Sequence, residues 1–441
     1  MNFKPFLLSL TAFSASLAVV AQSRWTLQDC ISYALENNIQ IQQSNLTAES
    51  SEVTVKQSQA AFFPTLTFST SQQFGFQKVE TQDVSTYDAT AKNPTYTGSY
   101  GLNLNVTLYD GLSNVNTLKQ SRIQHESDIY SAQKTSNNVQ LQIIQNYYQI
   151  LYAHESVLTN EEIVRVAERE LERTKAKLEV GKGSKVDVAQ MESQYQQNQY
   201  SLVNARNQEA AYILTLKQLL QLGTGDEFAI DYQSFSTDDV MALLPTVDEA
   251  QQMTLANLPD MKAAQLDVQS AELATKIAKA GYQPTLSLSA SVATSNGNTY
   301  NNNFAEQVKD HMHESVGLTL SVPIWDGRRT RSSVDKSKIQ LSAAELAQED
   351  TRLDICNTIA SLHLDITSAQ ARYASAVKSE VSAKESFELM EQRFDVGLES
   401  VVELLSEKNK YLQARQETLQ SKYTALLNIE TMKFYTKMEG L

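Results

Sequence analysis

The most constraining feature of the sequence is the length of its segments that lack helix-breaking residues. Residues 112–222 contain no proline, and their only glycines are Gly181 and Gly183. Because both residue types are penalised inside helices, we predict one helix over Ser113–Glu179, a turn at the glycines and a returning helix. The first helix, with 67 residues, would be about 100 Å long, too long for an ordinary globular domain.

The same pattern occurs a second time. Residues 328–439 again contain no proline, and their sole glycine is Gly397, which predicts a second long helical hairpin. Shorter motifs are repeated in the same order: Phe63-Pro64-Thr65-Leu66 returns as Gln283-Pro284-Thr285-Leu286, and Tyr109-Asp110-Gly111 returns as Trp325-Asp326-Gly327. Self-similarity at a nearly constant spacing indicates a tandem duplication.

The duplication divides the chain as follows. Residues 1–21 combine Lys4, an apolar stretch and Val19-Val20-Ala21, the layout of a cleavable signal peptide. We expect a first structural repeat over 22–222, an inter-repeat linker over 223–246, and a second repeat with a short C-terminal tail over 247–441.

Each repeat begins with a predicted helix. Thr26 and Asp29, and later Thr246 and Glu249, have the spacing of a capping box. A helix of about 36 residues is then expected to reach the proline of each short motif, because proline moves the preceding residue out of the helical region.

After each of these prolines the hydrophobic period changes from 3.6 to 2, which predicts strands. Two strands are expected in each repeat, separated by polar loops over about 77–95 and 293–314. Apolar residues alternate with Thr, Ser and Asn, and each strand is long enough to cross a membrane when tilted. The residues predicted to face lipid are Leu66, Phe68, Leu102, Leu104, Val106, Leu286, Leu288, Leu318, Leu320 and Val322.

The sequence also limits the partners of the chain. After the signal peptide no stretch is apolar enough for a spanning helix, so a membrane would have to be crossed by strands. The balance of 37 basic and 51 acidic residues disfavours nucleic acid as a partner. Two cysteines, Cys30 and Cys356, are too few for a disulfide framework and are best interpreted as small buried apolar residues.

Four membrane strands in one chain require an oligomer, because the edges of an open sheet cannot be satisfied in hydrocarbon. Two copies would give eight strands and a filled interior, whereas three would give twelve and begin to leave a lumen. The polar alternate face of the strands favours the water-filled barrel of three copies.

Taken together, these features make the chain resemble the TolC-like outer membrane efflux protein family over essentially its whole mature length. The resemblance rests on the doubled order of elements and on two tip segments, Leu178-Glu179-Val180-Gly181 and Arg393-Phe394-Asp395-Val396-Gly397, each with an acid six residues after its glycine. The first tip lacks the arginine and aromatic residue of the second.

The resemblance implies a mostly α-helical fold with a small β part. Three copies would form a twelve-stranded barrel in the outer membrane and an α-helical barrel in the periplasm, with the linker in the equatorial region. Such a homotrimer would be the exit duct of a tripartite drug-efflux or type I secretion system. Its partners would be outer-membrane lipid, a periplasmic adaptor (membrane fusion protein) and an inner-membrane transporter of the RND, ABC or MFS type.

Two groups of candidate site residues lie at the hairpin ends. Acids that could narrow a tunnel by forming rings of carboxylates, or that could be ordinary solvated helix residues, are Asp187, Glu403 and Glu407. Residues expected to contact an adaptor are Val180, Gly181, Lys182, Gly183, Phe394, Val396, Gly397 and Leu398.

No catalytic motif is found, and neither a cofactor nor a metal is expected. His311 and His313 could form a metal pair, but an exposed loop is the more economical interpretation. The alternative to a channel is a structural periplasmic coiled coil or an adaptor protein without channel activity. An adaptor would carry one hairpin inserted into a β domain. A structural coiled coil, such as a trimeric adhesin, would not need paired membrane-type strands.

Overall fold

The computed structural model describes residues 24–78, 92–223, 225–298 and 302–437. The predicted signal peptide lies outside these residues. Within the described part of the chain, none of the helices combines the length and the apolar character needed to cross a membrane.

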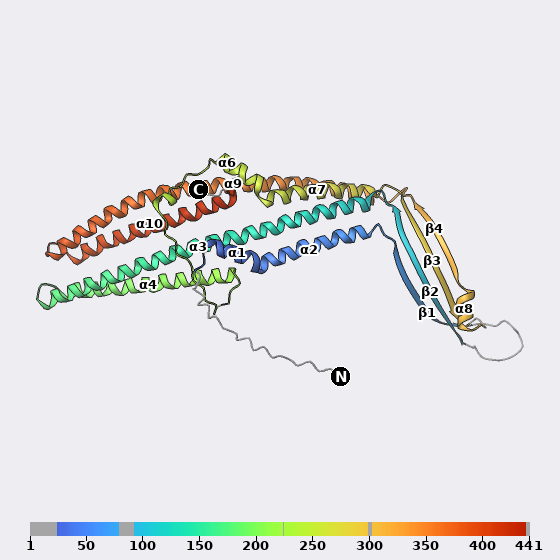
Figure 1. Cartoon of the computed structure of the whole chain (residues 1–441), viewed down its shortest axis with the longest axis horizontal. Coiled ribbons are helices and arrows are strands. Elements are labelled where there is room, and N and C mark those ends of the chain that lie inside the picture. Colours follow the sequence, from blue (N-terminus) through green and yellow to red (C-terminus); the bar gives the residue numbers. More distant parts are fainter. Residues whose placement is uncertain (1–23, 79–91, 224, 299–301, 438–441) are drawn as a thin grey trace, which may run out of the picture. The chain divides into compact units, whose positions relative to one another are not determined.

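The described chain is mostly helical and contains one small sheet (Figure 1). The elements before the predicted linker are α1 (Leu27–Asn37), α2 (Ile39–Ala60), β1 (Thr65–Lys78), β2 (Lys92–Tyr109), α3 (Ser113–Glu179) and α4 (Lys185–Leu219). After the short α5 (Thr237–Val240) follow α6 (Val247–Asn257), α7 (Pro259–Ala280), β3 (Thr285–Gly297), α8 (Phe304–Asp310), β4 (His313–Ser321), α9 (Arg329–Asp395) and α10 (Val401–Thr436).

The long helices agree with the prediction: α3 and α9 each have 67 residues. The predicted capping boxes are also present, because Thr26 and Asp29 cap α1 while Thr246 and Glu249 cap α6.

The prediction of one continuous helix at the start of each repeat is wrong. The first is broken at Asn38 and the second at Leu258, and both residues have extended backbones. At the second break the cause is Pro259, which begins α7 and removes the preceding residue from the helical region. At the first break, where no proline is present, the Asn38 side chain donates a hydrogen bond to the Leu219 carbonyl at 2.9 Å.

The strands and their loops also differ from the prediction in detail. β1, β2 and β3 contain 14, 18 and 13 residues, so they extend into segments expected to be loops. The second of these loops contains α8. β4 ends at Ser321, before Val322, because the following Pro323 has no N–H group and restricts Val322.

The chain forms two compact units that do not coincide with the two sequence repeats. Of the described residues, those within 24–38, 139–242 and 366–431 form one unit, which we call the hairpin unit, and those within 39–138, 243–365 and 432–437 form the other, the sheet unit. Each unit therefore draws segments from both repeats.

In the hairpin unit, α3 turns into α4 and α9 turns into α10 (Figure 1). The core includes Tyr147 and Ile150 of α3 and Leu216 of α4. Polar residues interrupt the helix contacts: His154 of α3 lies 2.7 Å from the carboxylate of Glu209 on α4. The packing between these helices therefore combines apolar contacts with polar pairs.

In the sheet unit, the helices pack in the order α2, α3, α7, α9. Ser58 of α2 contacts Ser121 of α3 at 2.7 Å, and Gln120 of α3 donates to the carbonyl of Ser270 on α7 at 3.2 Å. The end of α7 meets the start of α9, where Thr330 contacts the Gly281 carbonyl. The strands form one antiparallel sheet in the order β1-β2-β3-β4.

Candidate functional site

The sheet has one apolar face, and the register brings its residues from different strands together. Leu66 pairs with Leu104, and Leu104 pairs with Ala290. Residues directly opposite each other on antiparallel strands share a face. The same face contains the pairs Phe68 with Leu102, Val106 with Leu288, Leu288 with Leu318, and Leu286 with Leu320. Several of these side chains, including Phe68 and Leu318, are exposed.

The opposite face of the sheet is polar. Thr67 pairs with Asn103, Asn103 with Ser291, and Ser291 with Ser315. The hydroxyls of Ser291 and Ser315 lie 2.9 Å apart, which shows that this face is lined by hydrogen-bonding groups. A sheet with one apolar and one polar face suits a boundary between lipid and water.

The connections from sheet to helix are alike in both repeats. Gly111 and Leu112 follow β2 with φ angles of 70° and 69°, and Gly327 and Arg328 follow β4 with 63° and 69°. The preceding aspartates then accept the first helical N–H groups, with Asp110 bound to Asn114 N and Asp326 bound to Thr330 N, both at 2.7 Å. The repeated Asp-Gly motif thus redirects the chain from strand to helix.

The outer elements of the sheet unit are unpartnered. Among the described residues no strand pairs with the outer edge of β1 or of β4. The outer helices α2 and α9 each expose apolar side chains at intervals of seven residues. These stripes consist of Ile39, Leu46 and Val53 on α2, and of Ile339, Leu346 and Leu353 on α9.

At the hairpin ends, the Val-Gly motifs end the outgoing helices in the same way. Gly181 and Gly397 have φ angles of 74° and 79°. Leu398 N–H donates to Arg393 O, and Gly397 N–H donates to Phe394 O, at 3.0 and 3.1 Å. These two bonds form a Schellman motif, which requires the left-handed backbone that glycine adopts readily.

The acids six residues after these glycines cap the returning helices. Glu403 accepts hydrogen bonds from Ser400 N at 3.0 Å and from Ser400 Oγ at 2.7 Å. Asp187 accepts a bond from Ser184 N at 3.1 Å in an equivalent capping box. The bonds from Ser400, through its hydroxyl and its amide, lower the pKa of Glu403.

Glu407 makes different contacts. Its carboxylate accepts hydrogen bonds from Lys410 at 2.6 Å and from Ser386 of α9 at 2.9 Å. These bonds, that from Lys410 first, lower the pKa of Glu407. Glu403 and Glu407 therefore remain ionised over the neutral pH range.

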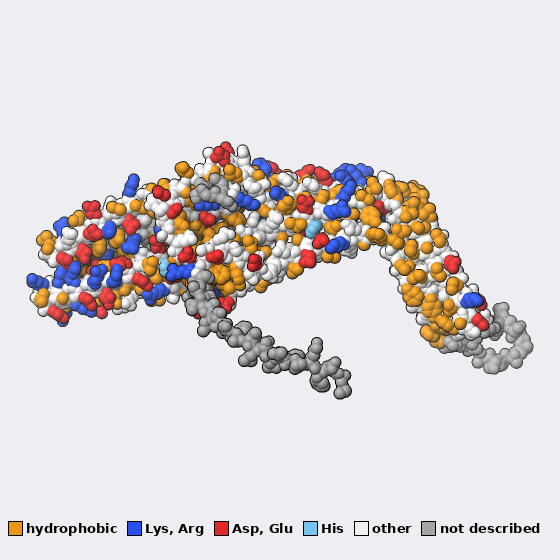
Figure 2. All heavy atoms as spheres, viewed as in Figure 1, with side chains coloured by type: hydrophobic (Ala, Val, Ile, Leu, Met, Phe, Trp, Pro, Cys, Tyr) orange, Lys and Arg blue, Asp and Glu red, His pale blue; other side chains and the backbone are white. Residues whose placement is uncertain are grey.

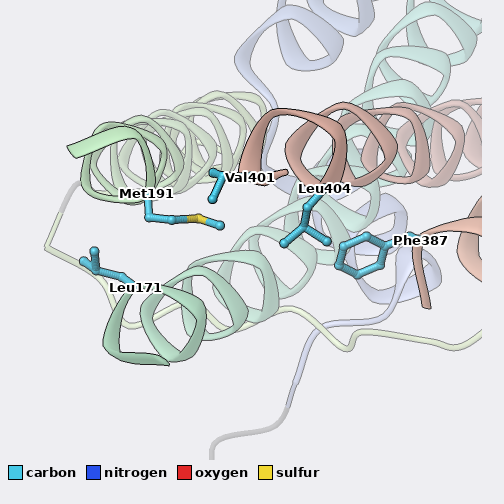
Figure 3. Packing of buried hydrophobic residues seen from close by; sticks show 5 residues of the cluster. All are labelled: Leu171, Met191, Phe387, Val401 and Leu404. Atoms are coloured by element: carbon cyan, nitrogen blue, oxygen red, sulfur yellow. The ribbon is translucent and has the colours of Figure 1, made fainter. Parts of the chain in front are cut away.

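Near their ends the two hairpins are joined by an apolar cluster, shown in Figure 3. The first hairpin supplies Leu171 and Met191, and the second supplies Phe387, Val401 and Leu404. Next to Leu171, Glu170 forms a buried ion pair with Lys408 of α10 at 2.5 Å. The hairpin ends are thus fixed to each other by packing and by charge.

Beyond this cluster, ion pairs continue toward the tips. Arg173 of α3 lies 2.9 Å from Asp395 and 3.5 Å from Glu391, both on α9. Lys177 donates to Phe394 O at 3.2 Å and lies 4.1 Å from the centre of the Phe394 ring.

The predicted docking residues fall into two groups. Val180, Val396 and Leu398 are exposed at the turns, whereas Phe394 packs against the apolar cluster. Lys182 and Gly183 continue the first turn, and the backbone N–H of Lys182 donates to Lys177 O at 2.8 Å. Of the predicted docking residues, Val180, Val396 and Leu398 are therefore the apolar side chains that the described structure leaves exposed.

No group of three or more potential metal ligands occurs among the described residues. His311 lies 2.9 Å from the Ser295 carbonyl, and His313 lies 3.2 Å from the His311 carbonyl. Both cysteines are free, with Cys30 buried and Cys356 partly buried.

The chain is similar in sequence to known outer-membrane proteins. Outer membrane protein TolC of Vibrio cholerae serotype O1 is 25% identical over 350 residues, which are 75% of this chain and 74% of that protein. TolC of Escherichia coli K12 is 25% identical over 288 residues, or 64% of this chain, and the match covers 58% of that protein, less than two thirds of its length.

The crystal structure of CusC has the same fold, with a TM-score of 0.80, 16% identity, and coverage of 93% of this chain and 91% of that one. The family model described as outer membrane efflux protein matches residues 30–221 and 250–435. Since these ranges include most of the sequence, the chain belongs to the outer membrane efflux protein family.

Proposed function

We propose that three copies of this chain form the exit duct of a tripartite efflux or type I secretion system. The four-stranded sheets would close into a twelve-stranded barrel in the outer membrane, and the long helices would form a tunnel in the periplasm. The duct would pass small molecules or proteins from a periplasmic adaptor and an inner-membrane transporter of the RND, ABC or MFS type to the outside. No enzymatic step is part of this proposal.

The observation that carries the proposal is the pair of unpartnered edges on the sheet unit. Each unpaired backbone N–H or C=O group on the edges of β1 and β4 would cost roughly several kcal/mol if it were buried in hydrocarbon. Pairing with another strand removes this cost. The edge of β1 in one copy is therefore expected to pair with the edge of β4 in the next. A head-to-tail contact of this kind closes into a ring when its rotation permits.

The apolar stripes on α2 and α9 fit the same arrangement, because α2 runs toward the sheet and α9 runs away from it. At 1.5 Å per residue, Val53, Leu46 and Ile39 lie about 10, 21 and 32 Å from the sheet end of α2. On the same scale Ile339, Leu346 and Leu353 lie about 15, 26 and 36 Å from the start of α9. The stripes therefore match level by level with a constant offset of about 5 Å, as expected for two antiparallel helices in contact.

The hairpin ends support the proposed partner contact. Val180, Val396 and Leu398 are large apolar side chains on turns, where a partner protein could cover them. Exposed apolar groups at such positions are typical of interaction sites.

The acids at the hairpin ends support a charged constriction as part of the proposal. Threefold symmetry would convert Asp187, Glu403 and Glu407 into three rings of carboxylates. Capping uses the carboxylate of Glu403 as a hydrogen-bond acceptor and keeps it ionised, so its charge remains available to attract cations.

Cross-linking tests the ring directly. In a Cys30→Ala, Cys356→Ala background, we expect Leu46→Cys combined with Leu346→Cys to be joined by a short bismaleimide between copies. Because each chain carries both cysteines, the products should extend to a covalent trimer and no further. The matched control moves the second cysteine to Glu345, which is exposed but lies about 100° away around α9.

Equal cross-linking in the control pair, or a ladder that continues beyond three chains, would contradict the proposed ring. The cross-linked trimer should also give discrete single-channel currents in a planar bilayer. A trimer without currents would favour the structural coiled-coil alternative.

A further inference from the structure

The helix ends next to the sheet hold an unusual concentration of positive charge. The chain has a formal net charge of −14, yet basic residues predominate on the turns of α3, α7 and α9 closest to the strands. We call six of these residues the basic collar: Lys119, Arg122, Lys276, Lys279, Arg329 and Arg331. All six are exposed.

The collar residues are not held in salt bridges with neighbouring acids among the described residues. Asp110 and Asp326, the acids closest to the sheet, accept N–H groups at the helix starts. The hydrogen bonds from Thr330, and to a smaller extent the charge of Arg329, lower the pKa of Asp326. Glu272 and Asp335 lie one helical turn from Lys276 and Arg331 and reduce the local charge without cancelling it.

The collar lies at a narrow level beside the apolar face of the sheet. At 1.5 Å per residue, the six positions lie within about 15 Å of the strand ends. Figure 2 shows a group of Lys and Arg side chains on these helix ends, on the same side of the molecule as the hydrophobic side chains of the sheet. The charge therefore lies next to the surface that would face lipid.

Exposed aromatic residues lie between the collar and the apolar strands. They are Phe62, Phe63, Tyr109, Tyr282 and Trp325, all at the junctions of strands with helices. Aromatic side chains gather at the level where hydrocarbon meets headgroups. From strand to helix, the order is thus apolar, aromatic and basic.

We propose that the basic collar binds the phosphate groups of anionic phospholipids in the periplasmic leaflet of the outer membrane. The inference rests on the proposed membrane position of the sheet and adds a specific lipid class to it. Basic residues at a membrane surface attract anionic headgroups by about fivefold in affinity per residue. Binding would fix the depth of the barrel and hold the helix ends against the bilayer surface.

The native Trp325 provides a probe, because the chain contains only two tryptophans and Trp25 can be replaced by phenylalanine. Purified trimer carrying Trp25→Phe would be titrated with phosphatidylglycerol bearing brominated acyl chains, which quench nearby tryptophan. Brominated phosphatidylethanolamine gives the zwitterionic reference. We expect preferential quenching by phosphatidylglycerol, and we expect salt to reduce the preference.

The collar variant combines Lys276→Gln, Lys279→Gln, Arg329→Gln and Arg331→Gln. It should lose the preference for phosphatidylglycerol by at least about tenfold. The matched control removes the same charge from exposed lysines of the hairpin unit, through Lys175→Gln, Lys182→Gln, Lys185→Gln and Lys378→Gln, and should keep the preference.

Equal preferences in the two variants, or no preference in the parent trimer, would overturn the lipid assignment. If soluble acidic cell-wall fragments removed the preferential quenching at a lower concentration than that of phosphatidylglycerol, the collar would be assigned to another polyanion. That result would also overturn the lipid assignment. Single-channel currents in neutral bilayers separate this question from the proposed function. A conducting trimer without lipid preference refutes only the collar, whereas a protein that forms no trimer in any lipid refutes the channel.

Discussion

The buried ion pair between Glu170 and Lys408 allows a strong test of how the hairpins are held together. The Lys408 side chain is 2% exposed and that of Glu170 is 7% exposed, with 2.5 Å between the ammonium nitrogen and one carboxylate oxygen. The other carboxylate oxygen of Glu170 is buried without a hydrogen-bond partner. The pair is therefore desolvated but incompletely satisfied.

Removal of one partner should leave an uncompensated charge in the interior. We expect Lys408→Met or Glu170→Leu to destabilise the hairpin unit by about 3–5 kcal/mol. The combined variant should recover most of the loss or exceed the parent by roughly 1–4 kcal/mol, since similar apolar volumes replace a costly pair.

The assay is thermal unfolding of the detergent-solubilised protein, followed by far-ultraviolet circular dichroism. At about 2–4 °C per kcal/mol for a unit of this size, each single change should lower the midpoint by roughly 6–20 °C, and the double change should restore it. Additive losses in the double variant would refute the reasoning, because they would show that the two side chains contribute independently. The exposed pair of Lys56 with Glu52 is the control, since removing one partner of a solvated surface pair should leave the unfolding midpoint nearly unchanged.

Three further predictions concern the strands and the tips. Leu104→Arg should impair assembly by about 2–4 kcal/mol if the residue lies near the middle of the membrane, whereas Asn103→Arg should be tolerated, as measured by the yield of heat-modifiable trimer. Gly397→Pro should abolish transport while the trimer persists, because proline cannot adopt a φ of 79°, and normal efflux in the variant would argue against tip docking. Glu403→Gln with Asp187→Asn should reduce cation selectivity and block by trivalent metal ions in planar bilayers, and unchanged selectivity would show that these acids only cap helices.

Much of the fold could be predicted because its signals are local. The bounds of α3 were readable from the absence of proline and glycine, and the two faces of the sheet followed from the period of two. The mostly helical architecture predicted from these patterns, and the family and outer-membrane location implied by the resemblance, are confirmed by the fold, the family model and the relatives.

Other features depended on signals that were weak or tertiary. Pro259 marks the break between α6 and α7 in the sequence, whereas the matching break at Asn38 contains no proline, and its side chain bonds a residue 181 positions away. The ion pair of Glu170 with Lys408 spans 238 positions, and no local pattern identifies it. The helix α8 was missed because seven residues within a polar segment are too few for a helical period to emerge.

The acids of the hairpin ends show how a family motif can have a local structural cause. Ser400 and Glu403, like Ser184 and Asp187, have the spacing of a capping box, and this spacing accounts for the acid six residues after each glycine without any reference to a channel. Capping requires an acceptor, whereas cation selectivity requires a charge. A glutamine at position 403 keeps an oxygen that can accept the Ser400 N–H bond, while an alanine loses both the acceptor and the charge.

The two roles therefore separate experimentally. If the charge of Glu403 sets the cation selectivity, Glu403→Gln and Glu403→Ala should reduce selectivity equally, and only the alanine should also destabilise the start of α10, because it removes the acceptor of the Ser400 N–H bond. The pH dependence has a definite sign: because the cap lowers the pKa of Glu403, its contribution to stability is present above the ordinary glutamate range and is lost as the pH falls through the lowered value. Selectivity due to Glu403 should persist to the same low pH, and its loss at a distinctly higher pH would assign the conducting charge to a different residue.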